Sequence, residues 1–174
     1  MRTYLERMNS VPAEIEEGAR PARLLAALGP KMIELSRELA NSAHPYLATP
    51  EQTAATRTIL GPAKWVVSEQ AVAIGGTAED QLRRAHAHVG AYLLLENYRK
   101  SWMRQGFDES DLVPGGSDRL VRALVGMGNA EQAATSITAH RDAGADHVVV
   151  QIISDGPASD PRPALRELAT ALHF

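Results

Sequence analysis

Gly29-Pro30-Lys31 is the stretch with the clearest potential for chemistry in this chain of 174 residues. It follows the apolar run from Leu24 to Leu28 and precedes residues with helical periodicity. Proline is pre-organised for the first position of a helix, and the unpaired backbone N–H groups just after it favour an anion. The pattern therefore predicts a loop that holds a phosphate group or a cofactor. The alternative is that Gly-Pro only turns a strand into a helix.

Two side chains at the end of the next predicted strand are further candidates. His44 can carry a proton near neutral pH and polarise a bound ring. Tyr46 can stack against a ligand or donate a hydrogen bond to it. The alternatives are a hydrogen-bonded histidine at a strand end, and a tyrosine whose ring lies in the core with its hydroxyl at the rim.

The remaining chemistry-bearing residues give weaker patterns. His86 and His88 are two apart on a predicted helix and diverge by about 200°, so they cannot hold a metal together. Gly75-Gly76 lacks the GxGxxG and Walker patterns of phosphate loops. The absence of cysteine excludes disulfides, thiolate metal sites and a cysteine nucleophile. We therefore expect no metal site.

Composition and charge exclude several classes of partner. The chain is 44% hydrophobic and 22% charged, which is typical of one globular domain. A net charge of −3 with scattered Lys and Arg gives no general attraction for nucleic acid or an anionic membrane. No apolar run approaches the roughly 20 residues of a membrane span, and no signal pattern is present. We expect a soluble, cytoplasmic protein with no nucleic-acid or membrane partner.

Predicted strands alternate with predicted helices, which indicates an α/β fold with a parallel sheet. The expected strands are 23–28, 43–47, 65–74 and 147–153. The expected helices after the Gly-Pro loop are about 30–39, 50–60, 78–105, 118–125, 130–143 and 164–172, and 107–116 is expected to be a loop. Four such strands make half of an eight-stranded barrel. Residues 1–22 are expected to be a helix remnant and linker, and 23–174 the half-barrel.

Several segments between Leu24 and Gln151 follow one another in a recognisable order: AALGPKMIELSRELA with AHPYLATPEQT, AYLLLENYRKSWMRQGF, GGSDRLVRALVGMG and AGADHVVVQ. In order and spacing they resemble the luciferase-like monooxygenases, in particular the coenzyme F420-dependent oxidoreductase branch. Members are (βα)8 barrels. The resemblance implies a partial TIM barrel here, strands 5 to 8, and the amino-terminal half of such a barrel has no counterpart in these residues.

The resemblance also implies a site at the carboxy-terminal mouth of the barrel, where barrel active sites lie. The loop after the fifth strand, close to the phosphate-bearing tail of the cofactor, comprises Ala27, Leu28, Gly29, Pro30, Lys31 and Met32. His44, Tyr46 and Gln151 are expected to line a substrate pocket at the same mouth, with His44 as the catalytic candidate.

The reaction implied is hydride transfer with coenzyme F420, or oxygen activation with reduced FMN, on a small-molecule substrate. Related barrels use the aromatic-rich segment from Tyr92 to Phe107 to pair subunits, so a homodimer is expected, although core packing is the simpler role for this segment. The alternative function is a non-catalytic half-barrel, or a truncated fragment, that acts by pairing with itself or with a complementary half.

Overall fold

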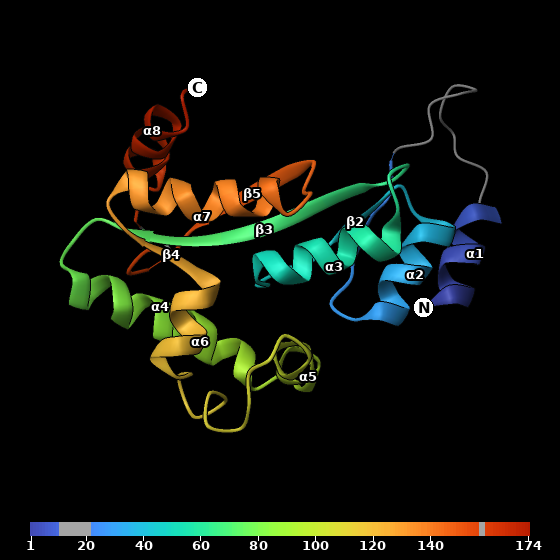
Figure 1. Ribbon diagram of the computed structural model, residues 1–174, viewed down its shortest axis with the longest axis horizontal. Helices are drawn as coiled ribbons and strands as arrows, with labels where there is room; N and C mark the ends of the chain where they lie inside the picture. The colour runs from blue at the N-terminus through green and yellow to red at the C-terminus, as the bar shows by residue number, and fades with distance from the viewer. Residues whose placement is uncertain (11–21, 157–158) are drawn as a thin grey trace.

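A parallel sheet with helices on both sides forms the body of the protein, as the computed structural model shows (Figure 1). The structure describes residues 1–10, 22–156 and 159–174. Its strands are β1 Leu24–Ala26, β2 Ser42–His44, β3 Trp65–Ile74, β4 Val125–Gly128 and β5 His147–Ile152. The connector expected between residues 9 and 21 falls almost wholly outside the described residues, so the division at residue 22 stays a prediction.

All strand pairs are parallel, which confirms the predicted α/β class. The strands β1, β2 and β3 are neighbours in that order, and β5 pairs with β3 along one of its edges. Strand β4 pairs with the last four residues of β3. Ala71 and Val72 pair with both β4 and β5, so these two strands lie on opposite edges of β3. Among the described residues the sheet does not close.

Strand β4 is absent from the sequence prediction, which assigned no element between the helices at 118–125 and 130–143. Its four residues are VGMG, with two glycines and no β-branched run, so the segment carries little strand propensity. It forms a strand because Val125 and Met127 pair with Ala71 and Ala73 of β3.

The helices are α1 Arg2–Ser10, α2 Pro30–Leu39, α3 Pro50–Leu60, α4 Ala78–Leu93, α5 Glu96–Arg104, α6 Asp118–Leu124, α7 Ala130–Asp142 and α8 Arg162–Ala171. The single helix expected at 78–105 is wrong: the chain breaks at Leu94 and Leu95, and Leu95 is extended. Helical periodicity continues across the break, so the sequence does not reveal it. The break lets α5 turn and bury Trp102 completely.

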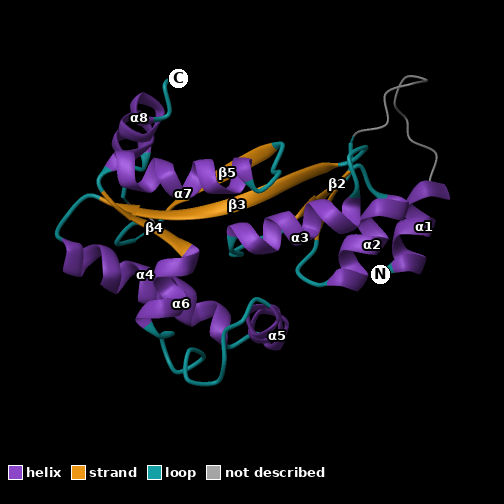
Figure 2. Ribbon diagram, viewed as in Figure 1, coloured by secondary structure: helices purple, strands orange, loops and turns teal. Residues whose placement is uncertain are grey.

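Strand register divides the sheet into two faces, because paired residues of parallel neighbours point to the same side. The outer face carries Val66 and Val72 and packs against α2, α3, α7 and α8. The inner face comprises Leu24, Ala26, Ser42, His44, Trp65, Val67, Glu69, Ala71, Ala73, Val125, Met127, His147, Val149 and Gln151. Figure 2 shows α4, α5 and α6 on the side opposite α7 and α8, where they cover the inner face around Ala71 and Ala73.

Arg57 of α3 holds together the loops at the end of the sheet where the strands begin. Its guanidinium donates to the carbonyls of Gly144 at 3.0 Å and of Gly61 and Lys64 at 2.7 Å each, and it pairs with Asp146. One group therefore satisfies three loop carbonyls that would otherwise lose their donor.

Arg57→Ala is expected to lower the free energy of unfolding by about 2 kcal/mol, because the three carbonyls lose a charged donor. Urea denaturation followed by circular dichroism measures the change. Arg141→Ala, at an exposed arginine of α7, is the control and is expected to stay within about 0.5 kcal/mol of the parent protein. Equal effects of the two substitutions would contradict the role of Arg57.

Candidate functional site

Helix α5 lies across the carboxyl ends of β1 and β2 and joins the loops that follow them. The Ser101 hydroxyl and the Arg104 guanidinium donate to the carbonyl of Leu28, at 3.2 and 3.1 Å. The Trp102 indole N–H donates to the carbonyl of Leu47 at 3.0 Å. Both strand-end loops that the sequence singled out are therefore held by one helix, at the edge of the sheet where barrel enzymes place their sites.

The loop predicted to hold a cofactor has a buried part and an open part. Ala27 is buried and its N–H donates to the carbonyl of His44 at 3.1 Å, while Met32 packs in the core under α2. Pro30 and Lys31 are exposed. The open part, from Gly29 to Lys31, is the portion that a ligand can reach.

Gly29 is the N-cap residue of α2, and no side chain caps this helix end. A Cβ at Gly29 would lie 3.3 Å from the nearest guanidinium nitrogen of Arg104. The positive end of the α2 dipole and Arg104 thus meet at one place, and Lys31 adds a positive charge to the first turn of α2, which suits an anionic group such as a phosphate. The sequence did not assign Arg104 to this loop, because α5 reaches it only through the unpredicted break in the helix.

Three tyrosines from three elements meet above the inner face: Tyr46 after β2, Tyr92 on α4 and Tyr98 on α5. The Tyr92 hydroxyl donates to the Tyr46 hydroxyl at 3.0 Å, and the Tyr46 hydroxyl donates to Oε1 of Gln151 on β5 at 2.6 Å. The ring centroid of Tyr92 lies 5.4 Å from that of Tyr46 and 4.8 Å from that of Tyr98. We call Tyr46, Tyr92 and Tyr98 the tyrosine cluster.

Burial keeps the hydroxyls of Tyr46 and Tyr98 protonated. It raises the pKa of Tyr98 to about 12 and raises the pKa of Tyr46 further above its ordinary value, with the Tyr92 hydrogen bond as a second cause. At neutral pH these groups are therefore hydrogen-bond donors.

His44 lies beside the tyrosine cluster and is partly committed to the sheet. Its Nδ1 lies 2.6 Å from the carbonyl oxygen of Val67, and its ring centroid lies 6.2 Å from that of Tyr46. The carbonyl accepts only from a protonated nitrogen, so Nδ1 is the donor and Nε2 is the atom left for a ligand. The structure brings His44, Tyr46 and Gln151 together, and their role in a substrate pocket stays a prediction.

Glu69 is a site residue that the sequence analysis did not single out. It lies in the middle of β3, is 2% exposed, and accepts a hydrogen bond from the Leu47 N–H through Oε2 at 2.9 Å. Its Oε1 has no hydrogen-bond partner among the described residues. Burial raises the pKa of Glu69 to about 7, against the lowering effect of the Leu47 N–H. The signal in the sequence that could have identified Glu69 was a single acidic residue within the predicted strand WVVSEQAVAI.

Two other histidines, His86 and His140, make contacts that serve the fold. His86 lies 3.0 Å from both the Gly115 carbonyl and an Asp118 carboxylate oxygen, and so ties α4 to the start of α6. His140 is completely buried, with Nδ1 2.8 Å from the Thr53 hydroxyl. Among the described residues no three His, Cys, Asp or Glu side chains gather in a way that could hold a metal ion.

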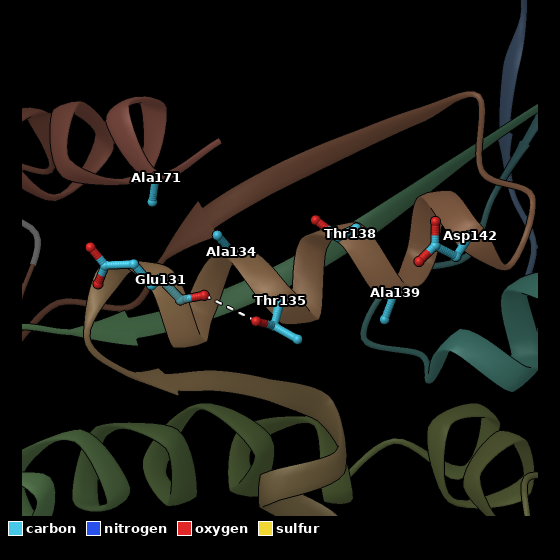
Figure 3. A pocket seen from close by; sticks show the side chains of 7 residues that line it. All are labelled: Glu131, Ala134, Thr135, Thr138, Ala139, Asp142 and Ala171. Carbon is cyan, nitrogen blue, oxygen red and sulfur yellow. Dashed lines mark hydrogen bonds between the residues drawn. The ribbon is translucent and has the colours of Figure 1, made fainter. Parts of the chain in front are cut away.

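A groove on the outer surface of α7 is lined partly by polar groups (Figure 3). It is lined by Glu131, Ala134, Thr135, Thr138, Ala139, Asp142 and Ala171. The Thr135 hydroxyl donates to the Glu131 carbonyl within the helix. The lining contains the carboxylates of Glu131 and Asp142 and no lysine or arginine. The groove lies on the outer helical layer, away from the strand-end loops, so it is a poor match for an anionic cofactor.

Comparisons with known proteins rest on structure alone. No protein-family model and no curated protein matches the chain. Within the described part, no helix has the length and apolarity needed to cross a membrane.

The chain superposes on an F420-dependent secondary alcohol dehydrogenase in complex with an F420-acetone adduct, with a TM-score of 0.61 at 11% identity, covering 89% of this chain and 50% of that one. A coenzyme F420-dependent tetrahydromethanopterin reductase from Methanopyrus kandleri gives 0.57 at 14%, covering 85% and 48%. EDTA monooxygenase from Chelativorans sp. BNC1 gives 0.57 at 16%, covering 89% and 44%.

This chain therefore spans about half the length of these solved structures. Its neighbours are oxidoreductases of the luciferase-like monooxygenase family, the family that the sequence resembles. At these identities the likeness establishes the fold alone: the chain is built like part of a TIM barrel.

Proposed function

We propose that this chain is the part of a luciferase-like oxidoreductase that holds a deazaflavin or flavin cofactor at the carboxyl ends of its strands. The observation that carries the proposal is the joining of the Leu28 and Leu47 loops by α5, within a fold shared with F420-dependent enzymes. Coenzyme F420 is the favoured cofactor and FMN the alternative, since two of the three neighbours described above are F420-dependent.

The residues at the α2 end fit the phosphate-bearing part of such a cofactor. At the uncapped N-terminus of α2, Pro30 has no N–H and the Met32 N–H donates to the Gly29 carbonyl, so the Lys31 N–H is the backbone donor that this end offers. Arg104 supplies positive charge beside Gly29, and the absence of a side chain at Gly29 leaves the approach to this N–H open.

The tyrosine cluster and its neighbours fit the flat ring. Tyr46 offers an aromatic face, and His44, Gln151 and Glu69 offer polar atoms around it. The cofactor, when bound, supplies the redox chemistry, which is hydride transfer for F420 or oxygen activation for reduced FMN. The chain's own residues orient the ring and exclude water, and Nε2 of His44 is positioned to hold or accept a proton.

Gly29→Asp is expected to abolish cofactor binding and at the same time stabilise the fold. Aspartate is a preferred N-cap residue, so it supplies the missing cap of α2 and adds a few tenths of a kcal/mol relative to glycine. The same carboxylate pairs with Arg104 and occupies the place of the phosphate. Quenching of F420 fluorescence measures binding, and thermal unfolding measures stability.

Lys31→Glu tests the charge of the same place without a new cap and is expected to weaken F420 binding about tenfold. Arg141→Glu, an equal change of charge at an exposed position of α7, is the matched control and is expected to leave binding unchanged. Absence of saturable quenching by a protein that also contains the complementary half of the barrel would overturn the proposed function.

A second function, self-pairing, is favoured by apolar side chains on the uncovered part of the inner face. Leu24, Trp65 and Val149 point to the same side of the sheet and are 47%, 62% and 39% exposed. Within the described residues β1 pairs only with β2, and β5 only with β3, so each has a free edge.

The occupant we infer for this face is a second copy of the chain. The strands β1, β2, β3 and β5 run parallel, and a two-fold axis along the barrel would set β1 of each copy against β5 of the other. Sedimentation velocity over a range of concentrations measures the association. Trp65→Glu is expected to raise the dimer dissociation constant at least tenfold, and a monomer at every concentration would exclude self-pairing.

A further inference from the structure

Leu47, the residue after Tyr46, has a backbone conformation that leucine rarely adopts. Its φ is 51°, in the left-handed region that favours glycine. Its side chain is buried in the core under α4, α5 and α6. Strained backbone of this kind persists where surrounding contacts over-determine it, and it concentrates at functional sites.

The contacts that hold this turn come from Glu69 and Trp102. The backbone N–H of Glu69 donates to the Pro45 carbonyl at 3.0 Å, and its carboxyl group accepts the Leu47 N–H at 2.9 Å. The Trp102 indole donates to the Leu47 carbonyl. Glu69 thus forms hydrogen bonds to the chain on both sides of Tyr46, and we call these two bonds, to Pro45 and to Leu47, the Glu69 grip.

Tyr46 is the residue whose placement this grip decides. Its hydroxyl accepts from Tyr92 and donates to Gln151, so it lies between the helical cover and the end of β5. A shift at Leu47 would move Tyr46 away from both partners. The second oxygen of Glu69 is not needed for the grip and has no partner among the described residues.

We propose that Glu69 is a positioning residue for the ligand of the inner face: by fixing Pro45 to Leu47 it places the ring and hydroxyl of Tyr46, and its spare oxygen makes ligand affinity depend on pH. This inference rests on the proposed function and deepens it, because it identifies what sets the geometry of the ring site. It differs from the sequence prediction, in which His44 is the titrating group.

The groups around Glu69 explain the direction of the pH dependence. Tyr46 from the β2–α3 loop and Tyr98 from α5 interact with it electrostatically, and both are neutral at pH 7. Tyr92 on α4 and His44 on β2 lie next to Tyr46. Among the described residues no lysine or arginine bonds to Glu69. Ionised Glu69 is therefore an uncompensated negative charge that opposes an anionic cofactor.

The test compares Glu69→Gln and Glu69→Leu with the unsubstituted full-length protein, using coenzyme F420 as the probe at pH 6 and pH 8. Glutamine keeps an oxygen that can accept the Leu47 N–H but cannot ionise, whereas leucine removes the acceptor. We expect the unsubstituted protein to bind about tenfold more weakly at pH 8 than at pH 6. The Glu69→Gln protein should have the same F420 affinity as the unsubstituted protein at pH 6 and should keep this affinity at pH 8. The Glu69→Leu protein should bind F420 at least tenfold more weakly than the unsubstituted protein at both pH values.

Two binding results would overturn the proposal. One is a folded Glu69→Leu protein that binds like the parent, and the other is a Glu69→Gln protein with the same pH dependence as the parent. Glu131→Gln, at an exposed acid of α7, is the control and should change neither value.

Fluorescence of Trp102 separates this inference from the proposed function. The chain has two tryptophans, so Trp65→Phe leaves Trp102 as the reporter of the Leu47 turn. In this background we expect an emission transition near neutral pH that Glu69→Gln removes. If F420 does not bind, the proposed function fails, but the fluorescence transition still tests the hydrogen bonds of Glu69 to the Tyr46 turn. Absence of the fluorescence transition overturns the inference. The fluorescence measurement also replaces the binding comparison if the Glu69→Leu protein does not fold.

Discussion

Trp102→Ala is expected to lower the free energy of unfolding by about 3–5 kcal/mol, the largest single effect that the structure predicts. Trp102 is completely buried and is the largest side chain in that state. It packs with Tyr98, at 5.7 Å between ring centroids, in the core cluster that also contains Val89 and Leu120. Its removal leaves a cavity between α5 and the inner face, and urea denaturation measures the cost.

The cavity and the lost hydrogen bond can be told apart. Trp102→Phe keeps an aromatic ring but removes the indole N–H, which leaves the buried Leu47 carbonyl without its donor at a cost of about 1–3 kcal/mol. Trp65→Ala makes the same change of residue at a largely exposed position and should cost about 0.5 kcal/mol. Similar losses at Trp65 and Trp102 would contradict the packing described for α5.

The elements that the sequence predicted well are those with strong local signals. The bounds predicted for β3, 65–74, are those found, since the segment WVVSEQAVAI has apolar ends around a polar middle and stops at Gly75-Gly76. The helix starts at Thr49 and Thr77 were also predicted, and both threonines cap their helices by accepting a backbone N–H. These features depend on neighbours in sequence, which is why the sequence alone suffices.

The features that were missed depend on tertiary contacts. The helix break at Leu94 and Leu95 has no proline or glycine to mark it, and it exists because α5 packs on the strand-end loops. The short strand β4 forms only because β3 offers an edge. Local propensity is a weak guide where packing decides.

The candidate site shows the same division. Gly29-Pro30 carries its own signal. Tyr46 and Gln151 lie 105 apart in sequence, and their meeting at one place was expected only through the family resemblance, whereas the hydrogen bond between them was not predicted. Glu69 was passed over because a parallel strand is buried on both faces, so its pattern does not tell which side chains point inward. Arg104 reaches Gly29 only after the helix break.

Two buried groups of opposite type, Glu69 and His140, are expected to give the stability of this protein an unusual dependence on pH. Burial raises the pKa of Glu69 to about 7 from 4.5, and burial lowers the pKa of His140 to about 4 from 6.5, against the opposing effect of Glu51. Each shift corresponds to about 3 kcal/mol between the two protonation states.

The two contributions have opposite signs. Between pH 4.5 and 7 Glu69 is protonated in the folded state and ionised in the unfolded state, so its contribution to stability falls as pH rises. Between pH 4 and 6.5 His140 is neutral in the folded state and protonated in the unfolded state, so its contribution rises with pH. From about pH 4.5 to 6.5 the two therefore nearly cancel, and substitution of either group should expose the other.

Relative to the unsubstituted protein, Glu69→Gln is expected to gain about 3 kcal/mol of unfolding free energy as pH rises from 4.5 to above 7, because the growing cost of burying an ionisable acid is gone. His140→Gln should show the reverse, losing about 3 kcal/mol relative to the parent between pH 4 and 6.5. Urea denaturation at closely spaced pH values measures both differences, and shifts common to all three proteins cancel in them. A pH-independent difference for Glu69→Gln would mean that Glu69 is ionised in the fold with a compensating donor on its second oxygen, and the neutral acid inferred for the inner face would then be wrong.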